Sequence, residues 1–249
     1  MLFQIAATTS FAKDCGTEAS FPNILNHLNY LNMEMEQNPT LNHSLEYLDF
    51  LSPLLSESPS RPLPTIGFPF HYERKSPPSD CWIDGYFQSE KYFIHNRADV
   101  LALFREADST SKAYEKYFKK DSGITISIHV RRGDYLKFPQ HHPIAPVSYY
   151  EEAIKKMGAF DRALVFSDDV EWCKATFRDP RFIFPQEKDY VELFLMSKCD
   201  KHIVANSSFS WWGAWLSNTS QVITPKIHLG VALSNLKDSD IHPKSWIKI

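Results

Sequence analysis

Hydrophobic and polar positions follow a regular alternation in the second half of the chain. From residue 123, short β-branched or apolar runs alternate with segments whose apolar positions recur at helical spacing. The predicted strands are 124–130, 163–167, 182–184, 201–205 and 221–225. The predicted helices between them are 148–157, 168–177, 189–199 and 209–216. Strands that alternate with helices predict an α/β fold with a parallel sheet covered on both faces.

The first half is less regular. Residues 1–16 have helical spacing and end at Gly16, a residue typical of a helix C-terminus. Residues 36–80 are polar and broken by prolines, which predicts many loops, and 97–118 again reads as a helix. The change in character predicts a boundary between 108 and 123. We place it after residue 115, which gives domains 1–115 and 116–249.

Composition limits the classes of partner. The 249 residues carry a formal net charge of -3, and the basic residues form no stripe, so a nucleic-acid partner is not expected. Any bound anion must therefore be held by a local cluster. The four cysteines form no C-x-x-C pair and are expected to be reduced thiols. Without a signal peptide or an apolar run of about 20 residues, we expect a cytoplasmic protein with at most peripheral membrane association.

Charge is concentrated where the strand 124–130 ends, in the stretch "HVRRGDY". The side-chain period of two places His129 and Arg131 on the same face, opposite Ile126, and directs Arg132 elsewhere. Ligands of open α/β sheets bind beyond the carboxyl ends of the strands, and a guanidinium fits phosphate oxygens. We therefore expect Arg131 to face a ligand. For Arg132 we favour the alternative, an ion pair with Asp134 within the turn.

Two more strand ends carry polar groups. Asp168 and Asp169 follow Ser167, either as ordinary residues of a helix start or with one carboxylate accepting two hydrogen bonds from guanine. Asn206, Ser207 and Ser208 leave the strand 201–205, and Phe209 or Ser210 opens a helix. Exposed N–H groups at such a helix start favour an anion, although a plain capping loop is the alternative. Three ends of this kind indicate a nucleotide diphosphate pocket. The nearby tryptophans Trp211, Trp212 and Trp215 are expected to pack in the core.

Four motifs, in this order, carry a family resemblance. They are "GYFQSEKYF", "HVRRGDY", "FSDDVEW" and "DYVELFLMSKCDKHIVANSSFSWWGAW". Together they resemble the α-1,2-fucosyltransferases of glycosyltransferase family 11. The element H-x-R-R-x-D-Y also resembles the arginine motif that α-1,2-, α-1,6- and protein O-fucosyltransferases share.

The resemblance implies a GT-B fold, in which two Rossmann-like domains face each other across a cleft. It implies that the C-terminal domain binds GDP-β-L-fucose and that no metal or other cofactor is required. By position, Arg131 would hold the β-phosphate and His129 would lie beside the nucleoside. Asp168 or Asp169 would read the guanine edge. The turn from Asn206 to Ser210, with Ser207, Ser208 and Phe209, would hold the pyrophosphate.

One departure from the family concerns the N-terminal domain. Family members normally begin with a strand and a G-G-x-G-N-Q turn directly before the "FQ" found here as Phe3-Gln4. This chain begins at Met1-Leu2, inside that turn. We therefore expect a truncated N-terminal, acceptor-side domain, with possible consequences for catalysis.

The expected reaction is inverting transfer of L-fucose from GDP-fucose to the 2-hydroxyl of a terminal β-galactoside on a glycan acceptor. Arg131 would stabilise the departing GDP. Asp134, which is close to it in sequence, is the candidate base that would take the proton of the acceptor hydroxyl. Glu90 and Asp84 are further candidates for the base. Two rival functions remain open: a nucleotide-sugar hydrolase or phosphatase, and a non-catalytic or impaired module that binds nucleotide sugars or carbohydrates.

Overall fold

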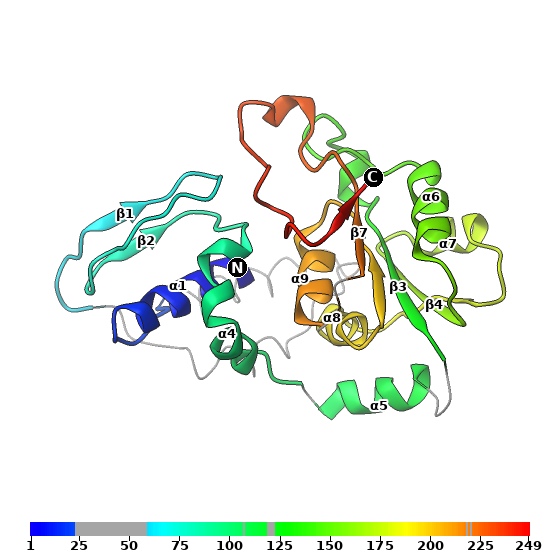
Figure 1. Ribbon diagram of the computed structural model, residues 1–249, viewed down its shortest axis with the longest axis horizontal. Helices are drawn as coiled ribbons and strands as arrows, with labels where there is room; N and C mark the ends of the chain where they lie inside the picture. Colours follow the sequence, from blue (N-terminus) through cyan, green and yellow to red (C-terminus); the bar gives the residue numbers. More distant parts are fainter. Residues whose placement is uncertain (23–58, 107, 119–122, 218, 220) are drawn as a thin grey trace. The chain divides into compact units, whose positions relative to one another are not determined.

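The computed structural model describes residues 1–22, 59–106, 108–118, 123–217, 219 and 221–249, and these form two compact units (Figure 1). The first unit comprises Met1–Ala107 and Lys237–Ile241. The second comprises Asp108–Leu236 and His242–Ile249. The chain therefore leaves the second unit near its end, adds a short segment to the first, and returns.

A six-stranded parallel sheet forms the centre of the second unit. Its strands are β3 (Thr125–Val130), β4 (Arg162–Ser167), β5 (Phe182–Ile183), β6 (Lys201–Ile203), β7 (Val222–Thr224) and β8 (Ile247–Lys248). They lie in the order β5-β4-β3-β6-β7-β8, and each neighbouring pair is parallel. The chain thus builds outwards from β3 first on one side and then, from β6, on the other. In such sheets the crevice for ligands lies beyond the carboxyl ends of the two strands at this switch, here β3 and β6.

Helices cover both faces of the sheet. They are α5 (Asp108–Tyr117), α6 (Val147–Met157), α7 (Val170–Thr176), α8 (Asp189–Ser197) and α9 (Ser208–Leu216). Ile126, Ile128 and Val130 of β3 pack in one cluster with side chains of α6 and α7. On the other face, Leu164 and Phe166 of β4 pack with side chains of α5 and α8. Short 3₁₀ helices, Asp134–Leu136 and Val231–Leu233, lie in the loops that follow β3 and β7.

The predicted α/β fold with a parallel sheet is confirmed, and so are the two faces of β3. Two details are wrong. The segment 97–118 contains two helices, α4 (Arg97–Leu103) and α5, because the chain is extended at Phe104. The strand β7 is not the last, because β8 pairs with it at the sheet edge, and a two-residue strand has no alternation to reveal it.

The boundary predicted after residue 115 lies inside α5, which here belongs whole to the second unit.

The first unit is built differently. It contains α1 (Leu2–Asp14), α4, the 3₁₀ helices Glu90–Tyr92 and Ile94–Asn96, and a parallel pair of strands, β1 (Thr65–Gly67) and β2 (Trp82–Asp84). The predicted end of α1 is confirmed, since Gly16 follows the helix with a left-handed φ of 66°. Residues 36–58 of the predicted loop-rich segment lie outside the described residues.

An aromatic cluster fills the interior of this unit. The rings of Phe11, Phe68, Phe87 and Tyr92 lie 5.0 to 6.2 Å apart between centroids, and Phe3 and Phe93 form a further pair at 6.3 Å. Phe87 is 1% exposed and has a φ of 53°, a left-handed conformation that is unfavourable for a bulky side chain. Burial of its ring among Phe11, Phe68 and Tyr92 offsets this backbone strain.

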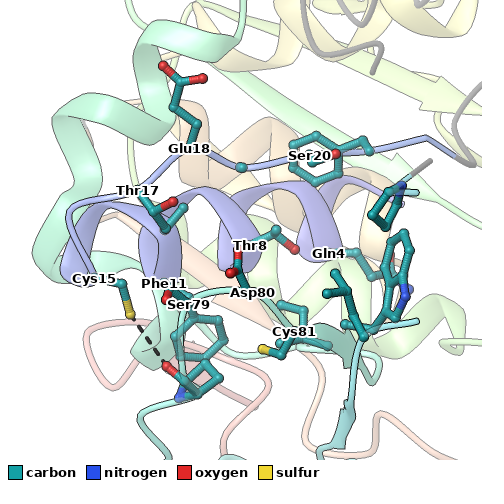
Figure 2. Close-up of a pocket in the computed structure, with 18 of the residues that line it drawn as sticks. Gln4, Thr8, Phe11, Cys15, Thr17, Glu18, Ser20, Ser79, Asp80 and Cys81 are labelled. Atoms are coloured by element: carbon teal, nitrogen blue, oxygen red, sulfur yellow. Dashed lines mark hydrogen bonds between the residues drawn. The ribbon is translucent and has the colours of Figure 1, made fainter. Parts of the chain in front are cut away.

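A cavity of about 600 Å³ lies in the first unit, beside α1 and the segment that leads into β2 (Figure 2). Its lining combines Phe11 and Trp82 with the polar side chains of Gln4, Thr8 and Asp80. Volumes of roughly 300–1,000 Å³ with a few polar groups are usual for small-molecule sites.

The cysteines and tryptophans agree with expectation. Cys15, Cys81, Cys173 and Cys199 are all free thiols. The tryptophans Trp211, Trp212 and Trp215 are at most 4% exposed and pack against one another, so they belong to the core.

Candidate functional site

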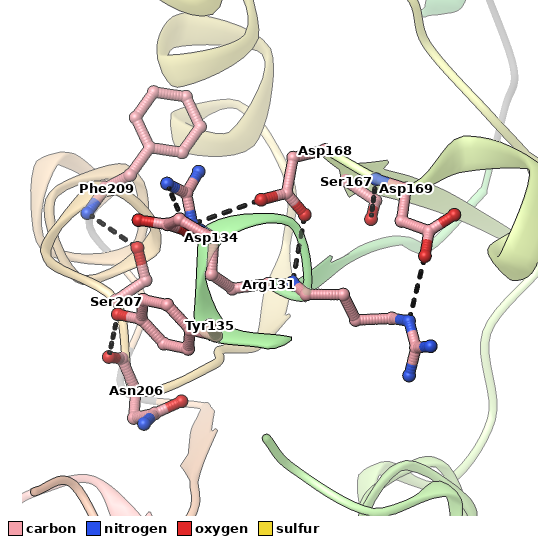
Figure 3. A network of polar contacts seen from close by, with 10 residues as sticks. Arg131, Asp134, Tyr135, Ser167, Asp168, Asp169, Asn206, Ser207 and Phe209 are labelled. Carbon is pink, nitrogen blue, oxygen red and sulfur yellow. Dashed lines mark hydrogen bonds and ion pairs between the residues drawn. The ribbon is translucent and has the colours of Figure 1, made fainter. Parts of the chain in front are cut away.

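The three polar strand ends lie side by side at the carboxyl edge of β4, β3 and β6 (Figure 3). The register pairs Val130 with Ser167, so Arg131 and Asp168 leave neighbouring strands at the same level. From the other side, the Tyr135 hydroxyl donates a hydrogen bond to the carbonyl oxygen of Asn206 over 2.9 Å. The sequence therefore predicted correctly which three segments come together.

Arg131 is held in place by two carboxylates. Its Nη2 lies 2.8 Å from Oδ1 of Asp134, and its Nε lies 3.2 Å from Oδ2 of Asp168. The guanidinium also lies 5.6 Å from the centre of the Tyr135 ring. A guanidinium has five N–H donors, so these pairs leave donors for a further anion. The Arg131 side chain is 34% exposed, which makes it accessible.

Arg132 does not pair with Asp134, so the ion pair predicted within the turn is wrong. Its Nε lies 3.0 Å from Oδ2 of Asp169, and its guanidinium lies 4.1 Å from the Trp172 ring centre. The reason is the alternation along the strand, which points Arg132 towards α7. The 3₁₀ turn then brings Asp134 back to Arg131, three residues before it.

Gly133 allows the turn to come close to β4. A Cβ atom at this position would lie 2.6 Å from Oδ2 of Asp168. Because there is no side chain, Oδ1 of Asp168 can accept the backbone N–H of Arg132 over 2.9 Å. The contact between Asp168 and the turn that carries the two arginines therefore depends on the absence of a side chain at Gly133.

His129 is buried and neutral. It is 4% exposed, and burial, together with the nearby charge of Arg131, lowers its pKa to about 3. Its Nδ1 is buried and has no hydrogen-bond partner in the part of the chain that the structure describes, although its ring lies 5.6 Å from that of Phe209. An unpartnered buried nitrogen is costly, and such groups often serve a ligand or an ordered water. His129 and Arg131 lie on the same face of β3, as predicted.

The turn from Asn206 to Ser210 starts α9. The Ser207 hydroxyl caps the helix by accepting the Phe209 N–H over 3.3 Å, and Ser208 is exposed. Ser210 is fully buried and donates to the Ser207 carbonyl oxygen over 3.4 Å. The Asn206 side chain is also buried, and its amide group bonds to neighbouring loops. The backbone of the turn and Ser208 are therefore better placed for a ligand than the other side chains.

Asp168 and Asp169 are occupied by contacts within the protein. Oδ1 of Asp168 accepts the Arg132 N–H, and its Oδ2 pairs with Arg131. Oδ1 of Asp169 caps α7 by accepting the Trp172 N–H, and its Oδ2 pairs with Arg132. Reading of guanine by either residue stays a prediction, and it would compete with these bonds.

Glu192 is a carboxylate that sequence reasoning missed. It lies in the first turn of α8 and accepts the Glu187 N–H over 3.2 Å. Burial is the main cause that raises its pKa to about 8, and the charges of Asp189 and Glu187 add to the effect. The residue is half-buried, and a carboxyl whose pKa is raised this far is a candidate functional group. An acidic residue within the apolar run "DYVELFLM" was the available signal.

Comparison with protein families gives a clear result for this chain. The model described as Glycosyl transferase family 11 matches residues 70–249, which is well over half of the chain. The chain belongs to this family. The match includes all the strand ends described above, so the family assignment and the site concern the same residues.

Two family relatives come from Escherichia coli. An alpha-1,2-colitosyltransferase is 33% identical over 178 residues, which is 66% of this chain and 61% of the relative. The O-antigen biosynthesis glycosyltransferase WbnK is 34% identical over 180 residues, 66% of this chain and 59% of the relative. The galactoside 2-alpha-L-fucosyltransferase Sec1 of Mus musculus is 24% identical over 172 residues, 62% of this chain and 45% of the relative. The chain thus spans less than two thirds of the length of these relatives.

Solved structures with some likeness are those of the alpha-1,6-fucosyltransferase NodZ. A crystal soaked with GDP-fucose has a TM-score of 0.38 and 14% identity, over 58% of this chain and 54% of NodZ. A selenomethionine form from Bradyrhizobium has a TM-score of 0.39 and 13% identity, over 87% of each chain. At this level the likeness carries no argument, and the fold assignment rests on the strand order itself. How the two units face each other, as the GT-B arrangement requires, stays a prediction.

The described part of the chain has neither a membrane-spanning helix nor a cluster of metal ligands. None of its helices is both long and apolar enough to cross a bilayer. No group of three or more His, Cys, Asp or Glu side chains there is arranged to hold a metal ion.

Proposed function

We propose that this family member transfers L-fucose from GDP-β-L-fucose to the 2-hydroxyl of a terminal β-galactoside, with inversion at the anomeric carbon. The bond between that carbon and the β-phosphate oxygen breaks, and a bond to the acceptor oxygen forms. GDP leaves with the electron pair, and the acceptor hydroxyl loses its proton. No metal ion or other cofactor has a part in this proposal.

The observation that carries the proposal is the presence of two groups at the switch between β3 and β6. They are the accessible guanidinium of Arg131 and the buried Nδ1 of His129, which has no hydrogen-bond partner among the described residues. Arg131 would bind the β-phosphate with the donors that its two carboxylates leave unused. Negative charge on this phosphate grows as the bond to fucose breaks, so a fixed guanidinium helps most in the transition state.

The remaining donor contacts follow from the same edge of the sheet. His129 would lie beside the nucleoside, where its free Nδ1 can meet a ligand atom. The start of α9, with Ser207 and Ser208, would hold the pyrophosphate. For the guanine edge, Asp168 and Asp169 are the predicted residues.

Asp134 is proposed to take the proton of the acceptor hydroxyl. Its side chain is 53% exposed, whereas that of Asp168 is 24% exposed, so Asp134 is the more accessible of the two carboxylates beside Arg131. The acceptor itself is proposed to bind to the first unit, whose cavity combines aromatic rings with polar side chains. Such a combination suits the two kinds of face that a sugar presents.

Binding and product analysis with the full chain test this function. Calorimetry should show that GDP binds and that ADP binds much more weakly. Incubation with GDP-fucose and a β-galactoside should give a disaccharide whose new linkage NMR assigns to the 2-hydroxyl. GDP-colitose is a useful second donor, because one relative is named a colitosyltransferase. Release of free fucose without transfer would favour a hydrolase, and absence of GDP binding would leave only the non-catalytic alternative.

A further inference from the structure

Asn206 uses both N–H groups of its side-chain amide within the protein. The residue is 3% exposed, and its Nδ2 donates to the carbonyl oxygens of Pro143 over 2.9 Å and of His228 over 3.1 Å. Both amide hydrogens thus have backbone acceptors, which also fixes the orientation of the amide. This arrangement leaves no donor of the side chain for a nucleotide.

The strand order explains why one residue can reach both loops. Asn206 follows β6, and β6 lies between β3 and β7 in the sheet. Pro143 belongs to the loop after β3, and His228 belongs to the loop after β7. A residue that leaves the middle strand is therefore next to the loops that leave both neighbours.

The two loops are also joined to each other above this point. Gly230 and Ala232 donate their N–H groups to the carbonyl oxygens of His141 and Gln140, over 2.8 and 2.9 Å. Within the loop after β7, Nδ1 of His228 lies 3.2 Å from Nε2 of His242, further along the chain. Asn206 is thus a buried part of a network that spans three strand ends.

This network reaches the arginine through Tyr135. The Tyr135 hydroxyl donates to the Asn206 carbonyl oxygen, and its ring lies beside the Arg131 guanidinium. Burial raises the pKa of Tyr135 to about 12, so the hydroxyl keeps its proton and remains a donor at neutral pH. The position of the turn that holds Arg131 therefore depends on where Asn206 is held.

We propose that Asn206 is a positioning residue, which fixes the loops after β3 and β7 so that Arg131 and the start of α9 together fit a nucleoside diphosphate. This inference rests on the proposed function and changes one predicted role within it. The side-chain N–H groups of Asn206 hold the two loops and do not touch the donor, and its backbone carbonyl holds Tyr135.

Two measurements on the Asn206→Ala variant test the inference. Hydrogen exchange in the GDP-free protein should become faster in peptides that cover 136–143 and 226–233. Calorimetry should show GDP affinity reduced by on the order of 10- to 100-fold, the scale of effect expected when binding groups are misplaced. Weaker GDP binding with unchanged exchange would mean that Asn206 contacts the nucleotide directly, and would overturn the inference. Faster exchange with unchanged GDP affinity would overturn it too.

Ser217→Ala is the matched control. Ser217 lies at the opposite end of α9, and its buried hydroxyl bonds to the Ala214 carbonyl oxygen and to Nε2 of His202. Its loss should lower stability without changing exchange in the two loops or GDP affinity. If Asn206→Ala does not fold, Tyr135→Phe removes only one hydroxyl and should give the same pair of effects to a smaller degree. Wild-type protein that binds no GDP would refute the proposed function, while the exchange measurement would still report on the loops.

Discussion

The two units of this molecule reach stable interiors in different ways. The second unit buries alternating aliphatic side chains of a parallel sheet between helices on both faces. The first unit, in its described residues, has only a two-stranded sheet and packs aromatic rings against one another. One interior follows from strand periodicity, and the other from a few large side chains at irregular spacing.

This difference matches the roles that we propose for the units. A sheet fixes the carboxyl ends of its strands relative to one another, so groups placed there keep their geometry as phosphate ligands require. A cluster of rings supported by loops imposes fewer constraints on the chain around it. Such a unit can accommodate different acceptors by changes in its loops, whereas donor recognition stays with the sheet.

The largest effect is expected from Arg131→Ala, which should lower kcat by on the order of 100- to 1,000-fold. The guanidinium is proposed to stabilise charge that develops on the β-phosphate, so its removal acts mainly on the transition state. Steady-state kinetics with GDP-fucose and a β-galactoside measure this effect. Near-native turnover in the purified variant would refute the role of Arg131.

Arg132→Ala is the paired variant for that experiment. Arg132 bonds to Asp169 and lies over the Trp172 ring, on the side of the turn that faces α7. We expect it to lower the melting temperature and to change kcat much less than Arg131→Ala does. A loss of activity as large as that of Arg131→Ala would show that the strand does not separate the two arginines by function.

The next prediction concerns the contribution of the aromatic interior to stability. Phe87→Ala should lower the free energy of unfolding by about 3–5 kcal/mol, because a fully buried ring is removed. Its neighbour Tyr86 is 62% exposed, and Tyr86→Ala should change stability by about 0.5 kcal/mol or less. Chemical denaturation measures both. Where the Phe87 variant remains folded, its GDP affinity should equal that of the wild type. A large loss of affinity would contradict the proposal that the two units have separate roles.

A pH dependence of the free energy of unfolding is expected to originate at Glu192. Its pKa is raised from the usual 4.5 to about 8 in the folded protein, so the folded state holds a proton that the unfolded state has lost between these values. Stability from this group is therefore complete below about pH 4.5 and is lost as the pH rises towards 8, by at most about 1.4 kcal/mol per pH unit. Glu192→Gln should remove this slope. Melting temperatures of both proteins from pH 5 to 8 give the difference, and parallel curves would exclude the shift.

Much of the second unit could be predicted from the sequence because β3 and its neighbours show a clear period. The alternation placed His129 and Arg131 on one face, and the strand order then brought Asp168 and Asn206 beside them. The partners of the charged groups could not be predicted in the same way. The pairing of Asp134 with Arg131 depends on a 3₁₀ turn, and the approach of Asp168 depends on the bare backbone at Gly133.

The first unit offered less to sequence reasoning for a physical reason. Phe11, Phe68 and Phe87 meet in space but come from a helix, a loop and a left-handed backbone position, and no short period links them. Glu192 was missed because one acidic residue in an apolar helix resembles an ordinary exposed position. Only its surroundings show that burial perturbs it.

The segment Lys237–Ile241 has a practical consequence for dividing the protein into fragments. It belongs to the first unit, where Asp240 forms an ion pair with Lys91, but it lies between two segments of the second. A single cut in the gene cannot separate the halves. A fragment that stops at residue 107 would lose the acidic partner of Lys91, and its complement would carry five residues with nowhere to dock. A deletion that removes everything from Lys237 onwards would likewise disturb both halves at once.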